Sequence, residues 1–510
     1  MLSTSTGGVT LGINAFFVLV EADVSAGLPG FTIVGLAESA VKESRERVKS
    51  AIKNSGYPFP TQKIILNLAP ADMKKEGTSL DLPIAAALLC VSGVIKQDIL
   101  KKFVLAGELS LDGRLRPTRG ILPLTMGAAH SNKFKGIIVP KENANEAAVV
   151  QGIDVFAVSN LSELVGFLRG ELEIPPTKLD INSLFEDETD EHIDFYDVIG
   201  QEQAKRALEV AASGGHNILM TGPPGSGKTM LARRLPTILP PLTYEEAIET
   251  TTVYSVAGLL DSNKALITKR PFRSPHHSIS DAGLIGGGTV PKPGEVSLAH
   301  NGVLFLDELP EFRKNVLECL RQPLEDGVVT ISRVSLTLTF PARMTLVCSQ
   351  NPCPCGHLGD PRHPCTCHPR QIQRYRDKIS GPLLDRIDLH IEVPAVEYKD
   401  LTTQRRGEDS KTIRERVKNC RKIQTNRFKG TSIYCNAQMG PEQIRKYCNL
   451  SKGASNFLGV AAQKLALSAR AYHRILKIAR TIADLVGSKN IEVEHVAEAV
   501  QYRGFDKKAA

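Results

Sequence analysis

The 510-residue sequence lacks any uninterrupted apolar run of about 18 residues, the length that a bilayer-spanning helix requires, so we expect no transmembrane segment. Its start, Met1 to Thr6, lacks the basic residues of a secretory signal peptide, and Glu21 and Asp23 follow closely. Both absences predict a cytoplasmic protein without a membrane partner. The length allows roughly two to four domains, and 42% hydrophobic with 23% charged residues is ordinary for a globular protein.

A strong excess of charge of one sign is also missing. Lys and Arg number 63 against 55 Asp and Glu, which leaves a formal net charge of +8. Such a modest basic balance permits nucleic-acid binding without indicating it. The ten cysteines are spread unevenly, because four of them fall in one short segment. In a cytoplasmic protein, where thiols stay reduced, such a cluster favours a metal site over disulfides.

The most specific motif is a complete phosphate-binding loop (P-loop), Gly222-Pro223-Pro224-Gly225-Ser226-Gly227-Lys228-Thr229. His216–Met220 before it is typical of a buried strand, and Met230–Leu235 after it is typical of the start of a helix. The glycines let backbone N–H groups face phosphates, Lys228 reaches the β- and γ-phosphates, and the Thr229 hydroxyl reaches Mg²⁺. The strand–loop–helix context argues against a chance Gly/Pro-rich turn. The sequence therefore predicts ATP and Mg²⁺ as cofactors.

A second apolar strand, Gly302–Leu306, delivers two carboxylates, Asp307 and Glu308, at its carboxyl end. Alone this is a weak pattern that a surface strand end also produces, but downstream of a P-loop it is the Walker B pattern. Asp307 is then expected to hold Mg²⁺ through water, and Glu308 to polarise the attacking water.

Other segments resemble parts of AAA+ ATPases. Asp197–Leu208 resembles the segment before their P-loop, although its apolar face also fits plain core packing. Asn351 follows the strand Met344–Gln350 and stands where these proteins carry sensor 1, with a strand-end turn as the alternative. Gly381–Leu389 resembles the arginine-finger stretch of Mg-chelatase and MCM-type ATPases, which implies that Arg386 reaches a neighbouring subunit's ATP. Arg470, which opens a C-terminal helix, matches sensor 2; an ordinary surface salt bridge is the alternative for either arginine.

Residues 1–170 alternate between strand and helix patterns. Strands are expected at Phe16–Val20, Phe31–Val34, Lys63–Leu68 and Phe103–Ala106, and helices at Ser39–Lys53 and Leu82–Val91. Gly107–Pro117 and Val139–Asn143 resemble the proteolytic domain of Lon proteases, which places Ser79 at the nucleophile position. The lysine base is expected soon after Gly120, but Ile121-Leu122-Pro123-Leu124 stand there. The resemblance thus implies the fold and not peptidase activity.

The whole chain is similar to the YifB/ComM family of Mg-chelatase-like AAA+ ATPases. The similarity is carried by Gly27–Leu36, Glu43–Val48, Asn67–Asp72, Arg270–Ser278 and Ala479–Leu485. It implies an α/β fold in which a Lon-protease-like, non-proteolytic domain (1–170) and an acidic linker (171–193) precede an AAA+ P-loop core (194–400) and a helical lid (401–510). It also implies a hexameric homo-oligomer that drives DNA branch migration, a helicase activity, in natural transformation.

Two segments are expected to meet single-stranded or branched DNA. One, Lys269–Leu298, carries Arg270, Arg273 and Lys292, and the other is a hairpin over Val328–Phe340 with its tip near Arg333. Basic side chains there would follow phosphates without reading sequence, although each is equally well explained as a solvated charge. A helix over Val316–Arg321, ended by Pro323, is expected before the hairpin. An ATP-driven protein remodeller or a metal-insertion motor subunit remains an alternative function.

The cysteine cluster consists of two C-x-C pairs, Cys353 with Cys355 and Cys365 with Cys367. Four thiolates suit tetrahedral Zn²⁺, although structural zinc pairs usually have two to four intervening residues. Nearby histidines are possible substitutes: His357, His363 and His368. A loop of reduced free thiols is the alternative. The sequence predicts a zinc site beside the ATP site.

Overall fold

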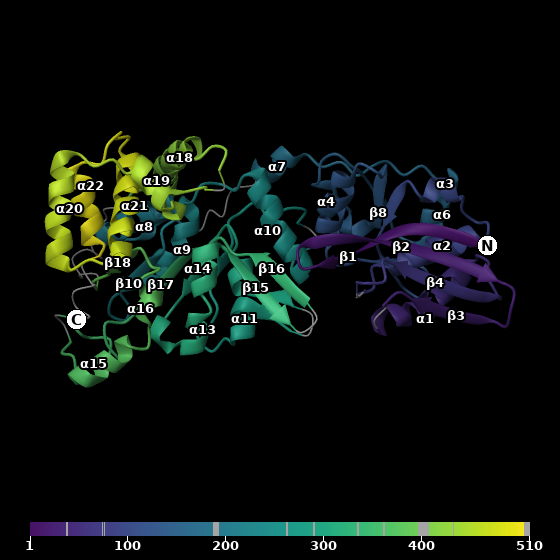
Figure 1. The fold of residues 1–510 in the computed structure, drawn as a ribbon, viewed down its shortest axis with the longest axis horizontal. Coiled ribbons are helices and arrows are strands. Elements are labelled where there is room, and N and C mark those ends of the chain that lie inside the picture. The colour runs from purple at the N-terminus through teal and green to yellow at the C-terminus, as the bar shows by residue number, and fades with distance from the viewer. Residues whose placement is uncertain are drawn as a thin grey trace. The chain divides into compact units, whose positions relative to one another are not determined.

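The computed structural model describes residues 1–36, 39–73, 75, 77–186, 193–261, 264–288, 291–333, 336–360, 363–395, 407–431 and 433–503. The chain divides into two compact units (Figure 1). The first comprises Met1–Asp187, Tyr244–Thr268 and Ser332–Phe340, and the second Glu188–Thr243, Lys269–Ile331 and Pro341–Ala510. None of the helices in the described ranges combines the length and the apolar character needed to cross a bilayer.

A seven-stranded mixed sheet forms the first unit, in the order β3-β4-β2-β1-β5-β8-β9. Its strands are β1 (Leu2–Leu11), β2 (Asn14–Ser25), β3 (Gly30–Val34), β4 (Lys63–Ala69), β5 (Phe103–Leu105), β8 (Gly136–Pro140) and β9 (Asp154–Val158). β2 pairs antiparallel with both β1 and β4, whereas β5, β8 and β9 run parallel. Along β2, Val18, Val20, Ala22 and Val24 are buried and alternate with half-buried or exposed residues. This period of two means that one face of the sheet is covered here.

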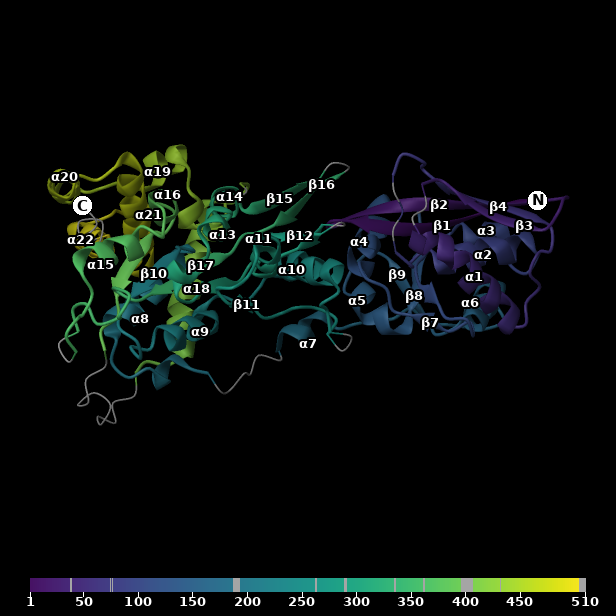
Figure 2. The same ribbon diagram turned by 90° about the horizontal axis from the view of Figure 1, so that it is seen from below.

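Helices cover the sheet because each presents apolar side chains to it, and α2 is buried along almost its whole length. α1 (Ser39–Asn54), α2 (Asp81–Val91) and α6 (Leu161–Arg169) pack into one cluster with the buried side of β2 and β4, as Figure 2 shows for α1 and α2. α4 (Ile121–Ser131) and α5 (Ala144–Ala148) pack on the opposite side of β5 and β8. The strands and helices expected in this part of the sequence are confirmed, within a few residues at their ends.

The expected acidic linker is partly structured. α7 (Ile181–Glu186) lies within it, and the Thr177 N–H donates to the Val155 carbonyl of β9 at 2.8 Å. Residues 187–192, which hold most of the acidic run, lie outside the described residues. The first part of the expected linker therefore has local structure, because it gains a backbone partner from the first unit.

The second unit contains a five-stranded sheet in which every pair is parallel, in the order β11-β14-β17-β10-β18. These strands are β11 (Phe272–Arg273), β14 (Val303–Leu306), β17 (Thr345–Gln350), β10 (Ile218–Thr221) and β18 (Leu389–Glu392). Ile218 of β10 lies between Val347 and Leu389 of its neighbours. The strands read as short continuous apolar runs because helices bury both faces.

Two helices of the core and five of the C-terminal region share one apolar cluster with this sheet. They are α8 (Glu202–Gly214), α9 (Lys228–Ile238), α18 (Ser410–Arg427), α19 (Pro441–Tyr447), α20 (Lys452–Leu465), α21 (Ala469–Leu485) and α22 (Val493–Gln501). One face of α21, which includes Ile475, Ala479 and Ile482, is buried. Ser468 caps this helix by accepting the Ala471 N–H.

A buried polar network also joins α21 to the sheet. His216, just before β10, bonds to Asp388 at 3.3 Å and to Thr481 of α21 at 2.8 Å. Arg474 of the same helix lies 3.4 Å from Asp388. Burial opposes ionisation of Asp388, but the His216 hydrogen bond and the Arg474 charge hold its pKa below the ordinary value. The lid is thus fixed to the core by paired charges as well as by apolar contact.

Pro323 does not end a helix, contrary to the sequence prediction. The structure instead has two short helices, α13 (Lys314–Glu318) and α14 (Arg321–Asp326), and Pro323 lies in the first turn of α14. Its missing N–H has no intrahelical partner to lose there, so proline is tolerated. The expected hairpin follows as β15 (Val328–Arg333) and β16 (Leu336–Pro341), while residues 334–335 of its tip lie outside the described residues.

A pH dependence follows from His390, which is buried on β18. Burial, together with the charges of Arg503 and Arg474, lowers the pKa of its imidazole from 6.5 to about 3. Below about pH 6.5 the unfolded chain therefore binds a proton at His390 that the folded chain does not bind. The contribution of His390 to the free energy of unfolding is fully present above about pH 6.5, and it falls towards pH 3 by up to about 1.4 kcal/mol per pH unit. We expect His390→Leu to lose this slope in urea unfolding series measured from neutral to acidic pH. Parallel curves for wild type and variant would contradict the assignment.

Candidate active site and metal centre

The P-loop turns between β10 and α9, and the helix begins at Lys228, two residues before the expected Met230. Glycine is required in it for two reasons. A Cβ on Gly222 would lie 2.1 Å from the Val393 carbonyl oxygen, so backbone packs against backbone there. Gly225 and Gly227 instead have φ of +74° and +87°, which side chains disfavour. The resulting turn directs the N-terminal N–H groups of α9 towards the space enclosed by the P-loop, where a helix end of this kind usually binds a phosphate.

Lys228 is held at the mouth of this loop. Its Nζ donates to the carbonyls of Gly222 at 2.8 Å and Pro223 at 2.9 Å, and lies 3.4 Å from Asn351 Oδ1. Burial lowers the pKa of the amine, while the charges of Asp307 and Glu308 oppose that effect. Phosphate oxygens would give Lys228 shorter, charge-assisted bonds than these neutral carbonyls do.

The predicted magnesium residues lie in contact. Thr229 Oγ1 donates to Asp307 Oδ2 at 2.8 Å, so the P-loop and the end of β14 meet. Ser349 of β17 donates to the other oxygen of Asp307, which orients the carboxylate. Sequence reasoning missed Ser349. Its only signal was a polar side chain two residues before Asn351, on a strand that also carries Thr345 and Gln350.

Glu308 follows with a left-handed backbone, φ +53°. Its N–H is 3.1 Å from Asp307 Oδ1 and 3.3 Å from Ser349 Oγ. This turn separates the two neighbouring carboxylates, because Asp307 faces Thr229 while the Glu308 side chain remains 56% exposed. The structure therefore brings Lys228, Thr229, Asp307 and Glu308 to one edge of the sheet.

A second residue that the sequence did not single out is Gln201, at the start of α8. It has a φ of +60°, and its side-chain amide donates to the carbonyls of Ser226 at 3.4 Å and Pro394 at 2.6 Å. These bonds tie the segment before α8 to the P-loop and to the residues that follow β18.

The two arginines lie apart from these contacts. Arg386, just after α16 (Gly381–Leu384), donates to the Pro382 carbonyl at 2.9 Å and forms an ion pair with Glu325. Arg470 is exposed in the first turn of α21. Within the described part of the chain, neither forms a hydrogen bond or ion pair with the P-loop. Their roles as arginine finger and sensor 2 stay predictions.

The structure gives two of the four proposed DNA-binding residues partners within the chain. Arg270 donates to the carbonyls of Pro240 at 2.6 Å and Asn301 at 2.7 Å. Arg273 donates two hydrogen bonds, of 2.6 and 2.7 Å, to the Glu295 carboxylate. Both therefore have a local structural role.

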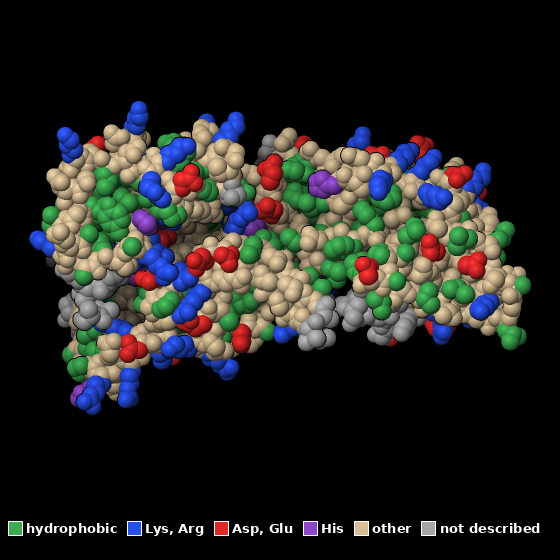
Figure 3. Space-filling view, viewed as in Figure 1, with side chains coloured by type: hydrophobic (Ala, Val, Ile, Leu, Met, Phe, Trp, Pro, Cys, Tyr) green, Lys and Arg blue, Asp and Glu red, His purple; other side chains and the backbone are tan. Residues whose placement is uncertain are grey.

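The other two candidates are exposed. Lys292 lies on the small hairpin of β12 (Gly286–Gly287) and β13 (Lys292–Pro293), and Arg333 ends β15. On the face drawn in Figure 3, Lys and Arg are interspersed with Asp and Glu, with no continuous basic surface among the described residues. DNA contact stays a prediction, and Lys292 and Arg333 on these two hairpins are the exposed residues among its four candidates.

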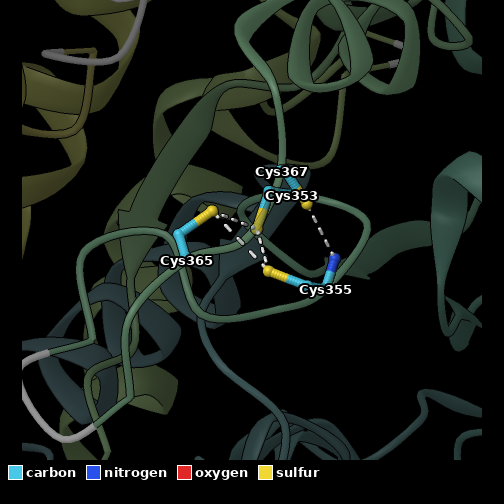
Figure 4. A group of neighbouring side chains, drawn as sticks. All are labelled: Cys353, Cys355, Cys365 and Cys367. Carbon is cyan, nitrogen blue, oxygen red and sulfur yellow. Dashed lines mark hydrogen bonds between the residues drawn. The ribbon is translucent and has the colours of Figure 1, made fainter.

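The four cysteines converge, as Figure 4 shows. Their Sγ atoms all lie within 4.8 Å of one another, with Cys353 3.3 Å from Cys355 and 3.7 Å from Cys365. A tetrahedron with metal–sulfur bonds of about 2.3 Å has sulfurs about 3.8 Å apart, so the spacing fits a single ion. Bonding to the backbone of His357 lowers the pKa of the Cys355 thiol to about 5. Among the described residues no histidine joins this group.

The cysteine loop also touches the P-loop. Gly356, between the two C-x-C pairs, has φ +84°, and a Cβ on it would lie 2.6 Å from Pro224 Cδ. Asn351, at the end of β17, lies two residues before Cys353. A metal held by the four thiolates would therefore fix the loop that bears on both Pro224 and Asn351.

The second unit has a parallel sheet in which the P-loop strand, β10, lies between β17 and β18. The Walker B carboxylates follow β14, and a helical lid follows the core. These features define an AAA+ P-loop ATPase. The family described as "Magnesium chelatase, subunit ChlI" matches residues 194–401. "Subunit ChlI of Mg-chelatase" matches residues 20–143, and "Magnesium chelatase, subunit ChlI C-terminal" matches residues 407–503.

Curated relatives extend the similarity to the whole chain. Competence protein ComM of Haemophilus influenzae is 46% identical over 97% of this chain and 96% of its own length. The uncharacterized protein YifB of Escherichia coli is 45% identical over 98% and 96%. Lon protease 2 of Bacillus subtilis is 34% identical over 26% of each chain, which supports the Lon-like first unit. The chain belongs to the YifB/ComM family of Mg-chelatase-like AAA+ ATPases.

The contact between the cysteine loop and the P-loop can be tested with Gly356→Ala. The added Cβ meets Pro224, so we expect ATP affinity, measured with a fluorescent nucleotide, to fall about tenfold, a loss of about 1.4 kcal/mol. Gly359→Ala is the matched control, because Gly359 has φ +82° but nothing within 4 Å of the added Cβ. Equal affinities for the two variants would show that the contact does not influence the ATP site.

Proposed function

We propose that the protein is an ATP-driven DNA motor that assembles into a hexameric ring and moves branched DNA during recombination and natural transformation. The observation that carries the proposal is the similarity, over nearly the full length, to a protein named for competence. The assembled ATP site supports the motor part of the proposal. The exposed hairpin residues Lys292 and Arg333 support the DNA part.

In the proposed reaction, Lys228 and the P-loop N–H groups bind the phosphates of ATP. Thr229 and Asp307 would hold Mg²⁺, which neutralises charge on the β- and γ-phosphate oxygens when bound. Glu308 accepts the proton of the water that attacks the γ-phosphorus, and the bond between the γ-phosphorus and the bridging oxygen breaks to give ADP and phosphate. Asn351, 3.4 Å from Lys228 Nζ, would orient that water and the γ-phosphate.

Arg386 would complete the site of a neighbouring subunit. Arginine fingers in GTPases raise the rate by roughly 10³–10⁵, so a single chain is expected to hydrolyse ATP slowly. Arg386 would exchange its Glu325 partner for phosphate in the ring.

DNA contact is proposed through phosphates rather than bases, because the candidate side chains are isolated cations on hairpins. Gly288, at the tip of the β12–β13 hairpin, has φ +107°, a backbone conformation that favours glycine. Arg270 and Arg273 are proposed to brace the start of this insertion instead of binding DNA.

We also propose that Cys353, Cys355, Cys365 and Cys367 hold a structural zinc ion. Four sulfur ligands close the coordination sphere, which is typical of structural rather than catalytic zinc. The ion would hold the loop that follows Asn351.

The motor proposal is tested by ATPase assays with single-stranded, duplex and branched DNA. We expect at least one form to raise the rate severalfold, and Glu308→Gln to lower the stimulated rate by about 10²-fold or more while ATP still binds.

Glu311→Gln is the control, since Glu311 lies one turn further on and pairs with Lys378 at 3.2 Å. No binding or stimulation by any DNA would refute the DNA motor. It would favour the protein-remodelling alternative, which rests on the Lon-like first unit.

The zinc proposal predicts about one metal ion per chain in the purified protein, because the four thiolates form one tetrahedral site. Cys365→Ser should lower the metal content severalfold, as measured by elemental analysis. Cys319→Ser, which changes a half-buried cysteine outside the cluster, should retain it. Four freely titratable thiols in metal-free wild-type protein would rule the site out.

A further inference from the structure

Two pairs of lysines from separate loops meet at one edge of the sheet in the first unit. Lys101 and Lys102 come directly before β5, while Lys133 and Lys135 stand in the short segment between α4 and β8. All four side chains are exposed, and we refer to them together as the lysine edge. It belongs neither to the ATP site nor to the two hairpins proposed to bind DNA.

The parallel pairing of β5 with β8 brings the two pairs together. Phe103 lies opposite Gly136, and one step earlier along both strands the Lys135 N–H donates to the Lys102 carbonyl at 2.8 Å. Neighbouring strands lie about 4.8 Å apart, so the side chains of Lys102 and Lys135 begin next to each other. Two like charges placed in this way repel each other and lower the stability of the sheet.

This repulsion is not offset by a carboxylate. Among the described residues, none forms an ion pair with any of the four amines. Asp98 in α3 (Gln97–Leu100) and Asp154 at the start of β9 lie on neighbouring elements, but both are exposed and neither is paired with the lysine edge. The C-terminus of α4 favours a nearby cation by about 0.3–1 kcal/mol, and only within its last turn, so it accounts for one lysine and not for four.

The backbone that carries the lysine edge is held in place on both sides. The Phe134 ring, in the segment before β8, packs against Phe17 of β2 with centroids 5.3 Å apart. α3 precedes the other pair, and its Gln97 side chain accepts the Thr4 N–H at 2.9 Å and donates to the Thr4 carbonyl at 2.6 Å. The lysines therefore project from a fixed backbone, and only their side chains have to adjust to a ligand.

A row of ammonium groups on a fixed edge suits the repeating phosphates of a polynucleotide. Lysine binds phosphate as a compact charge on a flexible stem, and contacts of this kind position a DNA strand without reading its bases. An anionic membrane offers the same charge, but surfaces that bind membranes commonly add apolar side chains that enter the bilayer. Here Phe134, the aromatic residue between Lys133 and Lys135, packs on Phe17 instead.

We propose that the lysine edge is a further DNA-binding surface, which lies on the Lon-like first unit and holds a phosphate backbone. The inference rests on the proposed DNA motor, and it gives the Lon-like unit the task of retaining DNA irrespective of sequence. Each phosphate that a lysine neutralises releases counterions. The slope of log Kd against log salt concentration therefore rises by about 0.9 per contact on duplex DNA and by about 0.7 on a single strand.

The test measures the affinity of the full-length protein for a fluorescent branched DNA at several KCl concentrations, with a slowly hydrolysed ATP analogue present. In the double variant Lys102→Gln/Lys135→Gln we expect the slope to fall by about 1.8, and Kd at about 100 mM KCl to rise about tenfold or more. Lys102→Arg/Lys135→Arg keeps both charges and should keep the wild-type slope. Removal of a repelling pair should leave the urea midpoint equal or higher, which separates weaker binding from unfolding.

Lys53→Gln/Lys63→Gln is the matched control, because it removes two charges from exposed lysines on α1 and β4 of the same unit. It should keep the wild-type slope. If wild type binds DNA, a wild-type slope in Lys102→Gln/Lys135→Gln overturns this inference alone, and so does an equal fall in the control. Loss of binding to phosphatidylserine vesicles with DNA binding unchanged also overturns it, in favour of a membrane surface. A wild-type protein that binds no DNA form overturns both this inference and the motor.

Discussion

The parallel pairing of β10, β14 and β17 is the constraint on which the ATP site depends. Parallel neighbours end at one edge of a sheet, so the P-loop, the Asp307–Glu308 pair and Asn351 meet although they are far apart in sequence. The hydrogen bond from Thr229 to Asp307 is the direct sign of this meeting. A shift of β14 by one residue would turn Asp307 away from Thr229, because strand side chains alternate between faces.

The cysteine loop extends that edge. Its first residues continue from Asn351, and Gly356 lies against Pro224 of the P-loop. The loop thus contacts the ATP site through Asn351 and through Gly356. A bound ion would cross-link the loop through its four cysteines and so hold it in one conformation. Nucleotide binding and metal binding would then stabilise the same local structure.

Local patterns in the sequence predicted the elements with the clearest apolar pattern, and the residues they singled out around the P-loop lie together at one edge of the sheet. The apolar run Gly302–Leu306 identified the strand that ends at Asp307, and the P-loop glycines identified the turn. Residues whose role depends on distant partners were not predictable: Ser349 acts through Asp307, and Gln201 through Pro394. The prediction for Pro323 was wrong because a proline can lie in the first turn of a helix as well as end one. Arg270 and Arg273 looked like free cations because their acceptors are remote in sequence.

The lid and the strands share one apolar cluster and the His216–Asp388–Thr481 network. Separating them would expose Ile475 and Ile482, take the Arg474 charge away from Asp388 and break the bond from His216 to Thr481, each at a cost in free energy. The lid and the strands that carry the ATP site therefore belong to one compact unit of the chain. In the proposed motor, a movement driven by hydrolysis would then reach DNA through the loops and hairpins of this unit rather than through a separation of lid and core.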